Sequence, residues 1–279
     1  MSLPDGASGG EIRPPAAAGL FYPADAARLV STVDSLLTAA EPRPDAVGRL
    51  PALVVPHAGY RYSGPVAAAA YARVGGWSPA RVVLLGPSHF LPLAGSAVPR
   101  AAAWCTPLGA VRIDTAARDR AMAVHGVHAA DEPHAHEHAL EVQLPFLQRS
   151  IGSDVPVLPV ATGASPDHIA DLLDAVASDA QTLVIASTDL SHYLPDADAR
   201  MRDAQTVRAV LDLRPGRVGS RSACGASALR GVLAWSRRAG LRSELVAYAT
   251  SANAGADPRR VVGYAAFVLS ADASGSPGD

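Results

Sequence analysis

Short runs of β-branched residues alternate with helical patterns along most of this chain. Strand-like runs occupy 52–55, 81–85, 155–160, 183–186, 245–249 and 261–269, and helical patterns occupy 25–39, 63–74, 166–178, 198–211 and 222–238. Such alternation is typical of βαβ units, in which helices cover both faces of a largely parallel sheet. We therefore expect a single three-layer α/β/α domain over residues 11–270, with a mainly parallel central sheet. Residues 1–10 and 271–279 are rich in Gly, Ser and Pro, and we expect disordered tails there.

Charge and composition exclude several classes of function. The formal net charge is −2, so no basic field is expected to gather nucleic acid or an anionic membrane. All 24 basic residues are Arg, in an Ala- and Gly-rich composition typical of a GC-rich bacterial genome. Without Lys there is neither a Walker-type phosphate lysine nor a Schiff-base amine. P-loop and lysine-nucleophile mechanisms are therefore excluded.

The cysteines and the N-terminal residues indicate a compartment. Cys105 and Cys224 are too few for a disulfide framework. The first residues have neither the basic nor the apolar region of a secretory signal, and no apolar stretch is long enough to span a bilayer. We expect a soluble protein of the cytoplasm, where thiols stay reduced.

Histidines follow two of the predicted strands directly. The run 52–55 ends in Pro56-His57, and the run 81–85 ends in Gly86-Pro87-Ser88-His89. Open parallel sheets bind ligands beyond the carboxyl ends of their strands. The sequence therefore predicts that His57 and His89 lie together at a ligand site, although either alone is often a structural, hydrogen-bonded residue.

Two further segments add polar groups of the same kind. The strand at 183–186 continues into Asp189 and His192, whose spacing lets a carboxylate orient an imidazole or both face a metal; a capped turn is the alternative. Cys224 lies at the start of the predicted helix that ends near Arg238, and a helix N-terminus favours the thiolate that binds metals. The alternative for Cys224 is a small buried apolar residue.

The segment 131–141 is rich in histidine and acidic residues but matches no standard zinc pattern. We expect Glu137, His138 and Glu141 to begin an amphipathic helix, with Glu137 or His138 at the rim of the pocket; an ordinary acidic helix start is the alternative. His134 and His136 are interpreted as solvated loop residues.

Aromatic residues near these motifs suggest the mouth of a pocket for a small organic ligand or a peptide side chain. They are Tyr60, Tyr62, Trp104 and Tyr193. Packing in the core is the alternative for each.

A series of short motifs lies along the chain from about residue 12 to 269, and their order is informative. They are Arg13-Pro14-Pro15, Ala18 to Pro23, Pro56 to Tyr60 with Tyr62-Ser63-Gly64, Gly86 to His89, Glu137 to Glu141 with Leu144-Pro145, Ser187 to Tyr193, Cys224-Gly225 and Val262 to Ala265. In this order they resemble the Memo family, also called AmmeMemoRadiSam system protein B. The resemblance implies a fold similar to the class III extradiol dioxygenases, which are non-haem iron enzymes.

The same resemblance implies a pocket and a metal. Its lining would be His57, His89, Asp189, His192 and Cys224. Those dioxygenases bind iron through two His and a Glu, whereas Cys224 takes the third position here, which argues against ring cleavage. Copper or iron binding and redox activity are implied for Memo-like proteins, as is a functional link to radical-SAM and AMMECR-type proteins.

Our main hypothesis from the sequence is a mononuclear metal oxidoreductase. His57, His89 and Cys224 would hold Fe(II) or copper, with zinc as a further option, while His192 transfers protons and Asp189 orients it or joins the metal. One alternative is a non-catalytic protein that binds a peptide, a metal or a small ligand in this pocket. Another is a zinc hydrolase.

Overall fold

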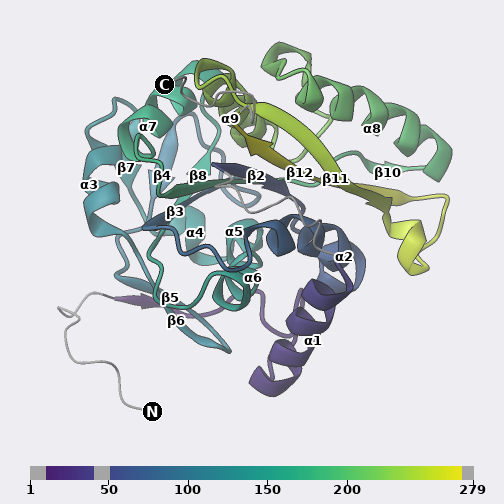
Figure 1. Ribbon diagram of the computed structural model, residues 1–279, viewed down its shortest axis with the longest axis horizontal. Helices are drawn as coiled ribbons and strands as arrows, with labels where there is room; N and C mark the ends of the chain where they lie inside the picture. Colours follow the sequence, from purple (N-terminus) through teal and green to yellow (C-terminus); the bar gives the residue numbers. More distant parts are fainter. Residues whose placement is uncertain (1–10, 41–50, 272–279) are drawn as a thin grey trace, which may run out of the picture.

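The computed structural model describes residues 11–40 and 51–271. Its helices are arranged around one large sheet (Figure 1). Its helices are α1 (Ala26–Ala39), α2 (Tyr60–Tyr71), α3 (Thr115–Met122), α4 (Glu132–Ala135), α5 (His138–Glu141), α6 (Leu144–Ser150), α7 (Pro166–Val176), α8 (Asp196–Leu211) and α9 (Ala226–Arg238). Its strands are β1 (Ile12–Arg13), β2 (Ala52–Val55), β3 (Arg81–Gly86), β4 (Ser96–Val98), β5 (Ala103–Thr106), β6 (Gly109–Arg112), β7 (Val127–Ala129), β8 (Val157–Thr162), β9 (Thr182–Ser187), β10 (His192–Leu194), β11 (Arg242–Thr250) and β12 (Val261–Ser270).

The central sheet has nine strands in the order β10-β12-β2-β9-β3-β8-β4-β7, with β11 paired to the other side of β12. Its middle strands β2, β9, β3 and β8 are mutually parallel. Strands β12 and β4 flank this parallel group in antiparallel pairings. A small separate sheet is formed by β1, β5 and β6. The α/β class is confirmed, with antiparallel strands that the periodicity did not reveal.

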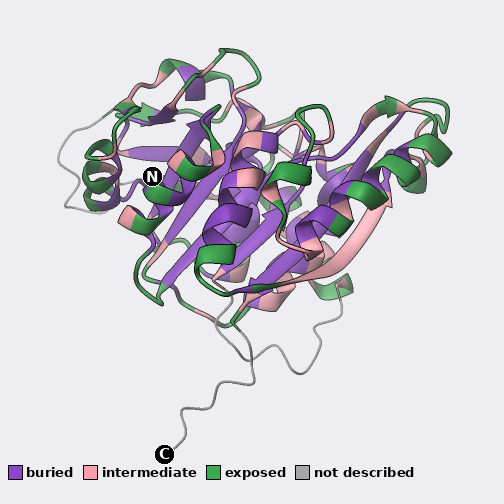
Figure 2. Cartoon of the chain, turned by 90° about the horizontal axis from the view of Figure 1, so that it is seen from above, coloured by how far each residue is buried: buried purple, intermediate pink, exposed green. Residues whose placement is uncertain are grey.

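Helices pack on both faces of this sheet because its strands are apolar on both sides. In β3, Val83 and Leu85 face a core built with α3, α7, α8 and α9, whereas Val82 and Leu84 face a core built with α1, α2 and α6. The middle strands are buried, most of β11 is of intermediate burial, and the outer sides of the helices are exposed (Figure 2). Continuous apolar runs are expected of parallel strands that are covered on both faces.

Local capping explains where helices begin. Helix α1 starts after Asp25, whose carboxylate accepts a hydrogen bond from the Arg28 amide at 2.8 Å. The expected start of the second helix at Ser63 is wrong, since α2 begins at Tyr60. The Ser63 hydroxyl donates to the Ala58 carbonyl instead of capping, and Pro65 lies inside the helix.

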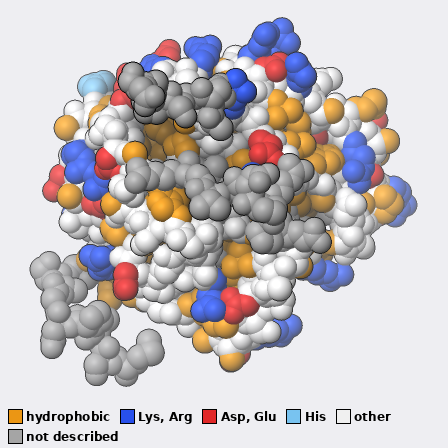
Figure 3. Space-filling view, in the orientation of Figure 1, with side chains coloured by type: hydrophobic (Ala, Val, Ile, Leu, Met, Phe, Trp, Pro, Cys, Tyr) orange, Lys and Arg blue, Asp and Glu red, His pale blue; other side chains and the backbone are white. Residues whose placement is uncertain are grey.

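The surface carries charges of both signs. On the face shown in Figure 3, Arg side chains are interspersed with Asp and Glu. Among the residues described, none of the helices is both long and apolar enough to cross a bilayer. The tails predicted at 1–10 and 271–279 lie outside the described residues, except for residue 271.

Candidate metal centre

The parallel pairing of β2, β9 and β3 brings three polar segments to one edge of the sheet. His57 follows β2, Asp189 follows β9 and His89 follows β3, and these strands are direct neighbours in this order. The ring centroids of His57 and His89 are 5.3 Å apart. The strand-end histidines therefore lie side by side.

His57 is buried at 2% exposure and its ring orientation is determined by Ser187. The Ser187 hydroxyl donates to the Ala139 carbonyl at 2.6 Å and accepts from the Gln143 amide at 2.9 Å. It can therefore only accept from His57 Nδ1, which lies 3.0 Å away. The Nδ1 atom carries the proton, and the lone pair of Nε2 faces Cys224.

Burial also keeps His57 neutral. Desolvation and the neighbouring His89 lower the pKa of His57 to about 3. Neutral imidazole is the form that binds metals, so this site needs no deprotonation of His57 at neutral pH.

His89 is oriented by a buried carboxylate, Glu137. The Glu137 oxygens accept from the backbone amide of His89 at 2.6 Å and lie 2.9 Å from its Nδ1 atom. Burial raises the pKa of Glu137, but hydrogen bonds from the side chain and backbone of His89 outweigh it and lower the pKa to about 2. An ionised carboxylate only accepts, so His89 Nδ1 donates and Nε2 is left as a free ligand.

His138 is a third imidazole in the same cluster. Its ring stacks on His89 at 4.8 Å and on Phe21 at 4.1 Å, and its centroid is 5.5 Å from that of His57. Ligand atoms of His57, His89 and His138 lie within 4.8 Å of one another. Burial and His57 lower the pKa of His138 to about 4. His138 therefore offers a donor atom inside the centre, not only at its rim.

Cys224 contacts the cluster through His57. Its Sγ atom lies 3.0 Å from His57 Nε2 and accepts a hydrogen bond from the Asp189 amide at 3.3 Å. A second set of potential ligands is formed by His57, Asp189 and Cys224. The expectation that the α9 terminus makes this thiol a thiolate is wrong for the metal-free protein. Burial and the Asp189 charge raise the pKa of Cys224 well above its usual range.

Asp189 and His192 have partners other than each other. Asp189 accepts from the His57 amide at 2.8 Å, and burial raises its pKa. His192 Nδ1 lies 2.9 Å from the Leu190 carbonyl, to which it donates, so in the neutral ring the Nε2 atom is the acceptor. Asp189 therefore positions the His57 loop, and a backbone carbonyl orients His192.

The aromatic residues expected at the mouth have different roles. Trp104 is fully buried beneath the Arg13 guanidinium, and the Tyr60 hydroxyl donates to the Val142 carbonyl inside the core. Tyr193 is 62% exposed and lies beside His192, with 5.6 Å between ring centroids. Tyr62 is partly buried and packs against the core on the α2 side. Trp104 and Tyr60 are core residues, and Tyr193 remains on the surface.

Two other residues of the 131–141 segment differ from expectation. His134 is fully buried against Trp104 and is not a solvated loop residue, whereas His136 is exposed. Glu141 is fully buried outside the cluster. It accepts hydrogen bonds from Arg13, from the Ala16 and Ala17 amides, and from the Tyr22 hydroxyl. Glu141 anchors the N-terminal segment.

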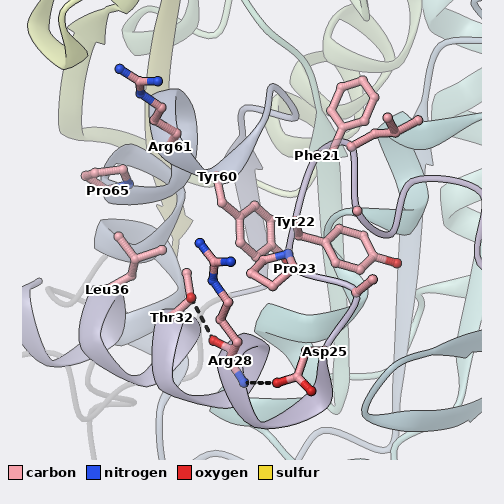
Figure 4. Close-up of a pocket in the computed structure, with 13 residues that line it drawn as sticks. Phe21, Tyr22, Pro23, Asp25, Arg28, Thr32, Leu36, Tyr60, Arg61 and Pro65 are labelled. Atoms are coloured by element: carbon pink, nitrogen blue, oxygen red, sulfur yellow. Dashed lines mark hydrogen bonds between the residues drawn. The ribbon is translucent and has the colours of Figure 1, made fainter.

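One cavity adjoins the centre, and a second lies beyond Phe21. The first, of about 300 Å³, is lined by Cys224. The second, of about 670 Å³, lies between α1 and the start of α2, where Arg28 extends toward Tyr60 (Figure 4). Phe21 lines this larger cavity and stacks on His138, so it separates that space from the imidazoles.

Ser187 and Gln143 were not singled out from the sequence. Ser187 immediately follows a buried strand, which is a usable signal for a polar residue at the site. Gln143 lies just before α6, and no local pattern indicates that its amide reaches Ser187.

Fold and site together define an α/β protein with a candidate metal centre of imidazole and thiol donors at the carboxyl edge of its parallel strands. The chain belongs to the family of Memo-like proteins, whose profile matches residues 13–268. It is 36% identical to a MEMO1 family protein of Aeropyrum pernix, over 92% of this chain and 99% of the relative. A MEMO1 family protein of Methanopyrus kandleri is also 36% identical, over 92% and 98% of the two chains. A third, from Methanococcoides burtonii, is 35% identical over 92% and 100%.

Proposed function

We propose that this protein is a mononuclear metal-dependent oxidoreductase. Its metal, iron or copper, would be held by His57, His89 and Cys224. The observation that carries the proposal is the 3.0 Å approach of His57 Nε2 to Cys224 Sγ, with the lone pair of Nε2 directed at the sulfur. Neutral imidazoles with one thiolate suit iron, copper and zinc better than magnesium or calcium.

His138 is the natural fourth protein ligand. Its ring lies against His89, and its donor atom belongs to the same group of close ligand atoms as those of His57 and His89. Asp189 is an alternative ligand on the Cys224 side. His57 is common to both sets, whereas His89 and Cys224 do not fall in one set, so a metal bound by both would require these two side chains to approach each other.

The residues around the donors have separate tasks in this proposal. When bound, the metal would supply one-electron redox chemistry and activation of oxygen. Glu137 keeps His89 in the tautomer whose Nε2 faces the metal. His192 Nε2 accepts and returns protons, because its Nδ1 proton is held by the Leu190 carbonyl. We place this activity in the cytoplasm, with a small organic molecule as substrate.

Metal analysis tests this proposal most directly. Protein purified without oxygen should contain iron or copper, located by anomalous scattering between His57, His89 and Cys224. The loaded protein should consume oxygen with a phenol, a catechol or a reductant faster than the free metal does. His89→Gln should lower both metal content and oxygen uptake, while Cys105→Ser, remote from the cluster, should change neither.

Three outcomes contradict the proposal. A centre that binds only zinc would indicate a hydrolase. A centre that binds no metal would indicate a protein that binds an organic ligand or a peptide. Oxygen uptake no greater than that of free metal, across the whole set of compounds, would show that the protein binds a metal but does not catalyse a redox reaction.

A further inference from the structure

The cavity beside Cys224 has a composition that indicates what it binds. Its volume of about 300 Å³ suits a small organic molecule. One side is formed by Pro87 and Ser88, which lead from β3 to His89, and another by Cys224 and the first turns of α9. A molecule in this cavity would therefore lie next to Cys224, one of the proposed metal ligands.

Arg230 gives this cavity a fixed positive charge. Its Nε atom donates to the Val218 carbonyl at 2.7 Å, which holds the guanidinium in place. Neither of its terminal nitrogens has a hydrogen-bond or ion-pair partner within residues 11–40 and 51–271. Among the described residues that line the cavity there is no Asp or Glu. No carboxylate in this described lining therefore balances the charge of Arg230.

Hydroxyl groups complete the polar part of the lining. They belong to Ser88, Ser220 and Ser227, beside Arg230. The Ser88 Oγ atom is inaccessible to solvent and has no hydrogen-bond partner among the described residues. The N-terminal turn of α9 adds partial positive charge on the same side. A bidentate anion would give the Arg230 guanidinium the partner that its terminal nitrogens lack.

We propose that this cavity is the substrate pocket of the metal centre and that it binds a small organic anion through Arg230. The carboxylate or phosphate of that molecule would pair with the guanidinium, and its remaining atoms would extend toward Cys224. This inference rests on the proposed metal-dependent function, because it names the class of substrate for the same centre.

Calorimetry on the metal-free protein tests the pocket without metal chemistry. Benzoate and benzamide have nearly the same shape but differ in charge, and inorganic phosphate distinguishes a phosphate site from a carboxylate site. At least one anion should bind, and benzoate should bind at least tenfold more tightly than benzamide if the site takes carboxylates. Arg230→Gln should weaken binding of that anion at least tenfold. Arg237→Gln, an exposed residue on the same helix, is the matched control and should have no effect.

A second variant fills the pocket itself. Ser227→Trp should abolish anion binding while the circular dichroism spectrum stays that of the wild type. The proposal is overturned if neither anion binds, if benzamide binds as well as benzoate with no phosphate binding, or if Arg230→Gln and Arg237→Gln behave alike. Metal uptake by Arg230→Gln should equal that of the wild type, so loss of the anion site and failure of the metal centre are measured separately.

Discussion

The Nε2 atom of His57 lies 3.0 Å from the Sγ atom of Cys224, although 167 positions separate the two residues in the chain. Two pairings bring them together. Strand β2, which leads to His57, is parallel to β9, and the backbone after β9 binds Cys224 through the Asp189 amide and carbonyl. A metal that takes both atoms must displace the thiol proton, which the partly buried Cys224 otherwise holds.

Metal affinity should therefore depend on pH through Cys224. Below the pKa of this thiol, each bound metal releases about one proton, so affinity should rise about tenfold per pH unit. Titrations from pH 6 to 8 in buffers of different ionisation enthalpy measure both quantities. Cys224→Ser should lower affinity and remove the proton release, whereas Cys105→Ser should do neither. Equal affinity and equal proton release in wild type and Cys224→Ser would show that the thiol is only packed.

Glu137 should tune the centre without binding the metal itself. Its carboxylate holds His89 by both the backbone amide and Nδ1. Glu137→Gln keeps the size of the side chain but loses the charge, and an altered second ligand shell typically costs about 10–100-fold in metal affinity. Competition with a chelator of known affinity measures the change. Glu132→Gln, on the exposed side of α4, is the control, and an equal effect of both variants would contradict the assigned role.

The local sequence was sufficient to predict that the residues following the strands belong to the site, because each strand and the residues after it are contiguous in sequence. His57 and His89 follow apolar runs that are recognisable alone, and the parallel pairing then brings them together. Contacts between distant segments were not predictable in the same way. The hydrogen bond from Gln143 to Ser187 and the burial of Trp104 depend on packing, which no single segment encodes.

The protonation state of Cys224 also depends on contacts that the local sequence does not encode. Its position before a helix was recognisable, and a helix terminus does favour a thiolate. Desolvation and the nearby Asp189 carboxylate act in the opposite direction and dominate. Both come from tertiary structure, so the sequence alone predicted the wrong sign of the pKa shift.

Gly225, beside the centre, should not accept a Cβ atom without a loss of stability and of metal binding. A Cβ atom there would lie 2.6 Å from the Ser187 carbonyl oxygen and 2.8 Å from the Thr188 Cβ atom. Gly225→Ala must push Cys224 away from the end of β9, so we expect a loss of about 1–3 kcal/mol in unfolding free energy together with weaker metal binding. Gly216→Ala, where an added Cβ meets nothing within 4 Å, is the control. Urea unfolding and metal titration that leave both variants like the wild type would contradict this packing argument.

Glu141 should affect stability and not metal binding. It is fully buried and accepts from the Arg13 guanidinium, the Tyr22 hydroxyl and two backbone amides. Glu141→Gln leaves the buried Arg13 charge without its partner, which typically costs about 3–5 kcal/mol. Urea unfolding of the metal-free protein measures this loss. Affinity for the metal in the folded variant should stay near that of the wild type, and a large loss of affinity would show that Glu141 belongs to the centre.

Acid should destabilise the metal-free protein partly through His134, which is fully buried. Burial and the Arg13 charge lower the pKa of His134 to about 4 in the folded state. An unfolded histidine has a pKa of about 6.5, so between about pH 6.5 and pH 4 the unfolded chain binds the extra proton and the folded chain does not. The stability from a neutral His134 is thus complete above about pH 6.5 and is lost as pH falls toward 4, by up to about 1.4 kcal/mol per pH unit. Urea unfolding of metal-free protein at several pH values should give a shallower slope for His134→Asn than for the wild type. His136→Asn, an exposed neighbour, should keep the wild-type slope, and identical slopes for all three proteins would show that His134 is already protonated in the folded state.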